Sequence, residues 1–369
     1  MHFDKGTRCS LIAYTNTSGI NAYDLVRACR PFGISVLTTD KRPISPIPVA
    51  WQIQSCSWLL FTEEKSLRAA IVNPLKHKFW PKQFDLNLLD DKYEFANWLS
   101  LQDLGISGLT QCSMAERRNL WYPYLVKAKH SWFGGRKMPR GWICRSEDDM
   151  HRALNCIQQQ GLQQDLFFLQ EWLGNSTVRV VSVCGYHDHG NARRNLTATV
   201  ERVSAHTNGL SCSAVVHTIG DSWGFVPKTQ RILDRLRYTG PYELEFLVTP
   251  DRQIVLELNP RFWMQHAIFA ADGNGVLRRY FGLDTLRDHA QSTIRNTAWF
   301  DGVHLLVSTL TLRLTPLCLY MKWRRRTGLR VVVSPPFHVA AVCLARIAWR
   351  KIQRLMRASY RGIVQDGHG

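Results

Sequence analysis

The chain has 369 residues, of which 45% are apolar, including 13 Trp and 16 Phe, so it can build more than one folded core. This composition excludes an intrinsically disordered protein. The net charge of +18 is uneven, because residues 301–369 hold twelve Lys or Arg against two Asp, a net +10, and the remaining residues carry +8. The basic character therefore belongs to the C-terminal part and does not define the function of the rest.

Ten cysteines are scattered along the chain, and none forms a Cys-x-x-Cys pair, which argues against zinc ribbons and thioredoxin-like redox sites. The N-terminal stretch lacks the charged-then-apolar pattern of a secretory signal. We therefore expect reduced, mostly buried thiols in a cytoplasmic protein.

The first elements in chain order are a strand, a helix and a strand. Leu11–Tyr14 is a short apolar run, Leu25, Val26 and Cys29 share one helical face, and Ile34–Thr38 is rich in β-branched residues. This βαβ start predicts a parallel sheet in an α/β protein. The loop "TNTSGIN" lacks the common glycine-rich phosphate fingerprints, so a plain turn is the favoured interpretation.

Two capped helices and a strand follow. Asp90 or Asp91 can cap a helix that we expect to end at Gly105. "YPYLVKAK" predicts a strand over Tyr124–Lys129, and "HSWFGGRK" a flexible glycine-containing loop. "SEDDMHRALNCIQQQG" predicts a second helix, which starts at the cap Ser146.

The next stretch is rich in strands. "LFFLQEWLGN" predicts a buried strand that ends in a glutamate and a hinge-like Gly-Asn pair. Val178–Cys184 and Leu196–Val203 predict two more strands around the polar turn "GYHDHGN". His187 and His189 in this turn have no third ligand nearby, so a solvated turn is favoured over a metal site.

Two alternating segments around the turn "TPDR" predict a β-hairpin. With the hairpin centred on Asp251, Glu245 faces Glu257. Glu243 then faces Asn259. Two carboxylates opposed at about 5 Å repel each other, which a solvated sheet face does not explain. A divalent cation removes this repulsion, because Mg²⁺ takes hard oxygen ligands. A one-residue slip would send the two glutamates to opposite faces.

In order along the chain, these motifs resemble the ATP-grasp superfamily, particularly its carbamoyl-phosphate-synthase-like and D-aspartate-ligase-like branches. The resemblance covers about residues 88–272. It rests on "LDDKYEF", "YPYLVKAK", "FFLQEWLGN" and the hairpin "LEFLV…IVLELNPRFW". It implies an α/β chain with four parts, namely a Rossmann-like pre-ATP-grasp domain (1–87), an N-terminal subdomain (88–170), a C-terminal subdomain with the metal hairpin (171–295) and a basic, mainly helical extension (296–369).

The resemblance also implies roles for individual residues. ATP would lie between the two subdomains and contact the following residues: Lys92, Lys127, Gly134, Gly135, Glu171 and Leu173. Mg²⁺, with Mn²⁺ as an alternative, would be held by Glu245, Glu257 and Asn259. Arg261 would meet a phosphate or the reacting acyl group. Arg202 would clamp a phosphate or a substrate carboxylate, and a surface arginine is an equal alternative.

The implied activity is ATP-dependent ligation of a carboxylate to an amine, or less often a thiol, through an acyl phosphate, with release of ADP. The partners would be small-molecule acids and amines. After the hinge, family members often offer an acidic residue to the ribose, whereas this chain has Asn175, Ser176 and Thr177. A weakened ATP-binding regulator is therefore an alternative, and so is a membrane-surface protein that uses the core as a scaffold.

The basic C-terminal part contains two features. The apolar run Val303–Met321 holds Arg313 and Pro316 near its middle, which disfavours a transmembrane helix. Residues 338–357 predict a helix with Arg346, Arg350, Arg354 and Arg357 on one face. Such a helix suits an anionic membrane surface, at the inner face of a membrane, or an acidic partner, and packing on the core is an equal alternative. No motif favours nucleic acid.

Overall fold

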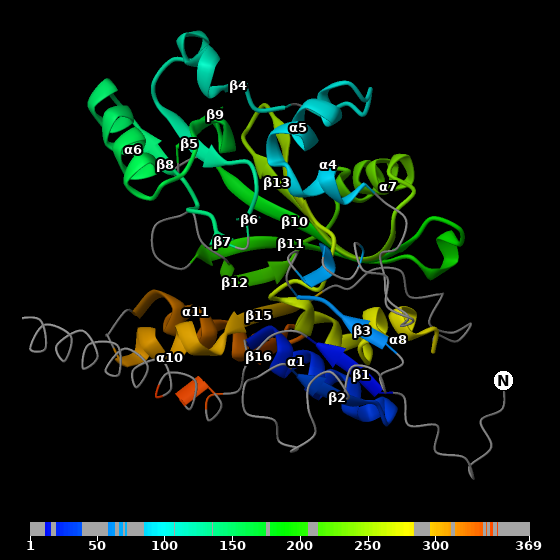
Figure 1. The fold of residues 1–369 in the computed structure, drawn as a ribbon. Helices are drawn as coiled ribbons and strands as arrows, with labels where there is room; N and C mark the ends of the chain where they lie inside the picture. Colours follow the sequence, from blue (N-terminus) through cyan, green and yellow to red (C-terminus); the bar gives the residue numbers. More distant parts are fainter. Residues whose placement is uncertain are drawn as a thin grey trace, which may run out of the picture.

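The computed structural model describes most of the chain, whose described strands form one large sheet and three smaller ones (Figure 1). The described residues are 12–15, 20–38, 58–62, 66–68, 71, 85–106, 108–134, 136–174, 178–205, 213–283, 296–310, 314–334, 337, 340–341 and 345. Short 3-10 helices connect several elements: η1 (Arg30–Phe32), η2 (Met114–Asn119), η3 (Gln164–Leu166), η4 (Ala192–Arg194) and η5 (His266–Asp272).

The N-terminal segment forms a small parallel sheet, as the strand–helix–strand pattern predicts. β1 (Ile12–Thr15) lies between β2 (Ser35–Thr38) and β3 (Trp58–Leu60) and pairs in parallel with both. α1 (Ile20–Cys29) connects β1 to β2. A right-handed crossover through a helix is the usual route between parallel neighbours.

The second sheet is antiparallel and has four strands. Its order is β4 (Gln111–Ser113), β9 (Phe167–Glu171), β5 (Tyr124–Ala128) and β8 (Trp142–Cys144). α6 (Glu147–Gln159) covers one face and buries Met150, Ala153 and Ile157 there. The Ser146 hydroxyl accepts a hydrogen bond from the Asp149 N–H, so the predicted N-cap is confirmed.

Two helices precede this sheet, α4 (Leu86–Asp90) and α5 (Lys92–Ser100). The predicted cap of α5 is confirmed, because the Asp91 carboxylate accepts hydrogen bonds from the N–H groups of Tyr93 and Glu94. The helix ends at Ser100 rather than at Gly105. The reason is that the Leu101 and Gln102 N–H groups bond to carbonyls three residues back, which tightens and closes the last turn.

The largest sheet has seven strands and supplies most of the core. The strands, in the order in which they pair, are β14 (Gln253–Asn259), β13 (Thr239–Val248), β10 (Arg179–Asp188), β11 (Leu196–Ala205), β12 (Ser213–Thr218), β15 (Thr297–Asp301) and β16 (Arg330–Ser334). Only the last pair is parallel. β15 and β16 lie in the segment predicted to be a mainly helical extension, yet they complete this sheet because β15 is buried throughout and pairs with β12.

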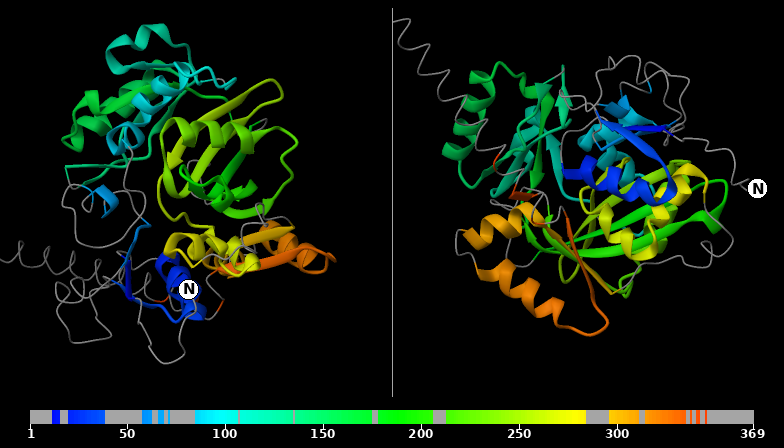
Figure 2. Two further views of the ribbon diagram at one scale, coloured as in Figure 1. Left: turned by 90° about the vertical axis from the view of Figure 1, so that its right-hand side faces the viewer. Right: turned by 90° about the horizontal axis from the view of Figure 1, so that it is seen from below.

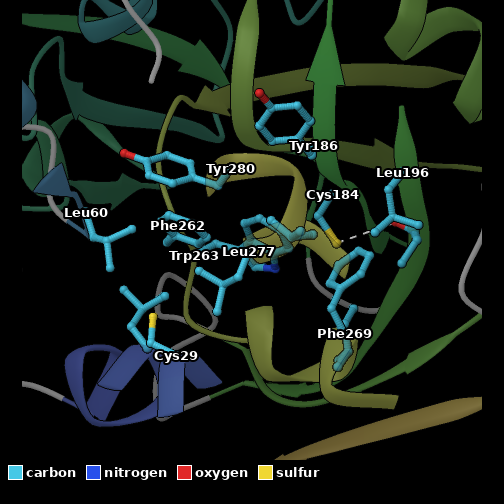
Figure 3. Close-up of a cluster of buried hydrophobic side chains, with 14 of the residues drawn as sticks. Cys29, Leu60, Cys184, Tyr186, Leu196, Phe262, Trp263, Phe269, Leu277 and Tyr280 are labelled. Carbon is cyan, nitrogen blue, oxygen red and sulfur yellow. Dashed lines mark hydrogen bonds between the residues drawn. The ribbon is translucent and has the colours of Figure 1, made fainter. Parts of the chain in front are cut away.

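Both faces of this sheet are covered by apolar side chains. On β10, Val181 and Val183 face the core shared with α5 and α7 (Phe225–Arg235), while Cys184 and Tyr186 face the core shared with α1 and α8 (Gly275–Phe281). Figure 3 shows this second core, in which the unpaired, buried Cys29 of α1 approaches the residues after β14. Burial on two sides explains why β10 is nearly continuous in apolar residues.

The polar turn after β10 differs from its prediction. β10 extends through His187 and Asp188, so His187 is a strand residue and is buried, not solvated. Its Nε2 atom lies 3.0 Å from Oδ1 of Asp234, and this contact satisfies the ring inside the protein. The expectation of a solvated turn was wrong for His187 and correct for His189, which is exposed.

The apolar run near the C-terminus forms two short helices, α10 (Gly302–Leu310) and α11 (Leu314–Arg324). In the part of the chain that the structure describes, no helix combines the length and apolarity that a membrane crossing requires. The arginines of the helix predicted over 338–357 lie outside the described residues.

A buried carboxyl group joins the two ends of the fold. Asp24 of α1 is 5% exposed and accepts a hydrogen bond from the Ser334 hydroxyl of β16. Burial raises the pKa of Asp24 to about 7, although Ser334 and Arg27 oppose the shift. The folded protein therefore holds this proton more tightly than the unfolded chain does.

We predict that Asp24→Asn makes the stability of the protein less dependent on pH. The stabilising contribution of protonated Asp24 is complete below about pH 4 and is lost as the pH rises through about 7, and it amounts to no more than about 4 kcal/mol. Denaturant unfolding at several pH values should show this loss in the wild type but not in the variant. The control Asp148→Asn, at an exposed position, should behave like the wild type. If the stability of Asp24→Asn falls with pH as steeply as that of the wild type, the raised pKa of Asp24 is contradicted.

Candidate active site

A cavity of about 730 Å³ lies between the four-stranded and the seven-stranded sheets. β5 and the end of β9 line one side, and β11, β13 and β14 line the other. Nine of the residues predicted for the site line this cavity: Lys92, Lys127, Glu171, Leu173, Arg202, Glu245, Glu257, Asn259 and Arg261. They come from segments that are far apart in the sequence.

The β13–β14 hairpin has the predicted register where the charged residues lie. Glu245 pairs with Glu257, and Glu243 pairs with Asn259. Between this end and the turn, the register shifts by one, because Phe246 pairs with Val255 and leaves an extra residue on β14. The two facing glutamates therefore lie on one face of the hairpin, toward the cavity.

Four cationic side chains surround the facing glutamates. Nζ of Lys92 lies 3.9 Å from Oε2 of Glu257, and Nη2 of Arg202 donates a hydrogen bond of 3.2 Å to Oε2 of Glu245. Lys127 and Arg261 line the same cavity. The cations differ in origin, because Arg202 belongs to β11 whereas Lys127 belongs to β5 of the other sheet.

The pKa values show how these charges balance. Burial would raise the pKa of Glu257, but Lys92 and Lys127 lower it below its usual range. The pKa of Glu245 is raised, first by burial and then by repulsion from Glu257. Burial also lowers the pKa of Lys127 to about 8, although Glu257 favours its charged form. Burial therefore disfavours the ionised forms of these groups, and the opposite charges nearby counteract it. Shifted pKa values of this kind are typical of functional sites.

Glu243 is a cavity residue to which the sequence analysis assigned no role. It is buried and accepts hydrogen bonds from Nδ2 of Asn259 at 3.2 Å and from Nε2 of Gln265 at 2.7 Å. The amide oxygen of Asn259 therefore points the other way, where it accepts a hydrogen bond of 3.3 Å from Arg261. This contact could have been predicted, because the predicted register places Glu243 directly across from Asn259.

The residues predicted to form a hinge also line the cavity. The carboxylate of Glu171 binds Arg252 at 3.0 Å and accepts a hydrogen bond of 3.2 Å from the Thr110 N–H. These contacts hold the pKa of Glu171 below its usual range, against the effect of burial. Leu173 and Gly174 follow along the cavity wall. The side chain of Glu171 thus joins the two sheets.

The glycine loop forms a small hairpin of β6 (Trp132–Phe133) and β7 (Arg136–Lys137). Gly134 is at its turn, with a φ of 56° that glycine adopts without strain. It lines a neighbouring cavity of about 560 Å³ rather than the main one, which is lined instead by Ser131, Trp132 and Lys137. Gly135 lies outside the described residues.

The donor set of the facing glutamates is compatible with a hard cation. Two carboxylates and an amide oxygen are the ligand types that Mg²⁺ prefers. The like charges of Glu245 and Glu257 face each other, and a cation between them would remove their repulsion. Among the described residues, no cluster of three or more His, Cys, Asp or Glu is arranged for a metal ion. The predicted site depends on the amide of Asn259 in place of a third acidic residue.

The sequence matches no protein-family model and no curated protein. Solved structures do match. Carboxyaminoimidazole ribonucleotide synthase from Aspergillus clavatus, complexed with ATP, aligns with a TM-score of 0.57 at 17% identity over 78% of this chain and 80% of that chain. N5-carboxyaminoimidazole synthetase from Staphylococcus aureus, complexed with ADP, aligns with a TM-score of 0.56 at 13% identity over 74% of this chain and 78% of that chain. This chain has the ATP-grasp fold.

A third neighbour is a carboxylase domain. The biotin carboxylase domain of 2-oxoglutarate carboxylase from Hydrogenobacter thermophilus was solved with MgADP, ADP and bicarbonate. It aligns with a TM-score of 0.55 at 16% identity over 79% of this chain and 73% of that chain. At these identities the likeness concerns the fold, and the substrates belong to the neighbours.

We predict that Lys127→Met stabilises the ligand-free protein at pH 7 and raises its melting temperature by a few degrees. Charged Lys127 costs stability below about pH 8, and this cost disappears as the pH approaches about 10.4, where the unfolded lysine also loses its proton. The difference between variant and wild type should therefore shrink between these pH values in thermal melts. Lys129→Met, outside the cavity, is the control. A variant less stable than the wild type at pH 7 would contradict this charge balance.

Proposed function

We propose that this protein is an ATP-dependent ligase that joins a carboxylate to an amine, or alternatively to a thiol, and releases ADP. The observation that carries the proposal is the meeting of two facing glutamates, an amide and four cations in one cavity. Structural neighbours solved with ATP or ADP support a nucleotide in the same region of the fold. A triphosphate and a divalent cation together match the mixed charges of this cavity.

We also propose the division of labour within the chain. Residues 88–170 and 171–295 would form the two halves that enclose the nucleotide, and residues 1–87 would precede them as a separate unit. Residues 296–369 would be an extension whose first part adds β15 and β16 to the large sheet. The hinge from Glu171 to Leu173 would meet the adenine through its backbone, because the carboxylate of Glu171 is already bound by Arg252.

Mg²⁺, with Mn²⁺ as an alternative, would be held by Glu245, Glu257 and Asn259. When bound, the ion neutralises phosphate charge and orients the γ-phosphoryl group for transfer. Glu243 would stabilise this arrangement, because it accepts a hydrogen bond from the Asn259 amide group and so fixes the direction of the amide oxygen. The contact from Arg202 to Glu245 offsets the charge of the carboxylates when no substrate is present.

The reaction would proceed in two steps. A carboxylate is a poor electrophile, so its oxygen first takes the γ-phosphoryl group of ATP, and ADP leaves. The nitrogen of the amine then attacks the carbonyl carbon of the acyl phosphate and displaces inorganic phosphate. Phosphoryl transfer depends on positioning and charge neutralisation, which Lys92, Lys127 and Arg261 would supply. Arg202 would bind the acid substrate or a phosphate oxygen.

The small hairpin of β6 and β7 would close over the phosphates. Trp132 and Lys137 already face the cavity, and Nζ of Lys92 donates a hydrogen bond of 3.0 Å to the Ser131 hydroxyl at the base of the hairpin. Movement of the hairpin would exclude water from the acyl phosphate, which hydrolyses readily. The residues that follow the hinge, Asn175 to Thr177, lie outside the described residues.

The test is release of ADP from purified protein in a screen of acid and amine pairs with Mg·ATP. We expect Glu257→Gln to reduce the rate by about 10²–10³-fold, because it removes one of the negative charges that would hold the cation. Glu94→Gln, exposed on α5, should retain full activity. If Mg·ATP raises the melting temperature but no pair releases ADP, the protein binds nucleotide without ligation and the proposal is wrong.

A further inference from the structure

α10 and α11 carry a set of exposed apolar side chains, which we call the apolar strip. Leu310 at the end of α10 is 72% exposed, and Met321 of α11 is 47% exposed. Cys318 is also exposed, and Leu317 is half-buried. Leu317, Cys318 and Met321 recur at helical spacing, so they share one face of α11.

The opposite face of α11 is also apolar. Leu319, Tyr320 and Trp323 pack on the small core formed by β15 and α10. α11 is therefore apolar on two sides, and the described residues cover only one of them. The other apolar face has no partner among the described residues. An exposed apolar helix face of this kind is typical of an interaction site.

A dense positive charge adjoins this apolar face. Lys322, Arg324, Arg325 and Arg326 are all exposed at the end of α11. From residue 302 to residue 334 the sequence contains no Asp or Glu, so this charge is not balanced locally along the chain. We call the residues Leu310, Leu317, Cys318, Met321, Lys322, Arg324, Arg325 and Arg326 the α11 surface.

We infer that the α11 surface binds the face of an anionic lipid membrane. Lipid fits both halves of the surface, since its acyl region accepts the apolar strip while its head groups attract the basic cluster. An acidic protein would use the charge but would leave the exposed apolar strip unused unless it brought a matching groove. No described helix is long and apolar enough to cross a bilayer, so the contact would be peripheral.

The α11 surface lies away from the cavity. It adjoins β15 and β16, at the opposite edge of the seven-stranded sheet from β13 and β14, which hold the facing glutamates. Figure 2 shows α10 and α11 at the periphery of the molecule. Binding through this surface would therefore leave the cavity open, and the inference does not depend on the proposed ligase activity.

The test is co-sedimentation of the full chain with phosphatidylcholine vesicles, with and without about 30% phosphatidylserine, at about 0.1 M NaCl. We expect binding to the anionic vesicles only. The triple variant R324Q/R325Q/R326Q should weaken it at least about tenfold. The matched control R193Q/R231Q/R235Q removes the same charge from exposed sites elsewhere and should bind within about twofold of the wild type.

The apolar half of the surface has its own variant. L310Q/M321Q keeps every charge, and we expect it to weaken binding by several-fold, most clearly at about 0.5 M NaCl, where the charge contribution is screened. Three outcomes would overturn the inference. These are failure of the wild type to bind anionic vesicles, an equal loss of binding in the control triple variant and the test variant, and wild-type binding by L310Q/M321Q. The last result would favour an acidic protein partner. Circular dichroism spectra and melting temperatures would verify that each variant folds.

Discussion

The structure depends on one unfavourable contact, the placement of Glu245 directly across from Glu257 on neighbouring strands. Like charges in this position destabilise a hairpin, so the fold must supply cations around them. It does so from three directions, with Lys92 at the start of α5, Lys127 on β5 and Arg202 on β11. Lys127 comes from the four-stranded sheet and Arg202 from the seven-stranded sheet, so the acidic pair meets positive charge from both sides of the cavity.

The surrounding framework keeps these charges in place. β13 presents alternate residues to opposite sides, so Leu244 and Phe246 belong to the apolar core while Glu243 and Glu245 line the cavity. At the hinge, Arg252 in the turn of the β13–β14 hairpin binds Glu171 at the end of β9 and donates a hydrogen bond of 2.8 Å to the Gly108 carbonyl. The same hairpin therefore joins the sheets at one end and holds the facing glutamates at the other.

Local patterns predicted the parts of the fold that local physics controls. The cap at Asp91, the cap at Ser146 and the register of Glu245 with Glu257 each depend on residues close in the sequence or on strict alternation. Contacts between distant segments carry no such signal. The sequence therefore did not show that β15 joins the large sheet, that Asp234 would contact His187, or that Gln265 would bind Glu243.

The width of the seven-stranded sheet separates the edge that holds the facing glutamates from the edge that adjoins α11. Six inter-strand steps of about 4.8 Å place β16 up to about 29 Å from β14, less whatever the twist removes. The potential of a charged surface decays over roughly 8–10 Å at physiological ionic strength. A molecule resting on lipid through α11 would therefore hold the facing glutamates beyond most of the repulsive field of the head groups. The nearest strand that lines the cavity, β11, is three steps from β16, about 14 Å.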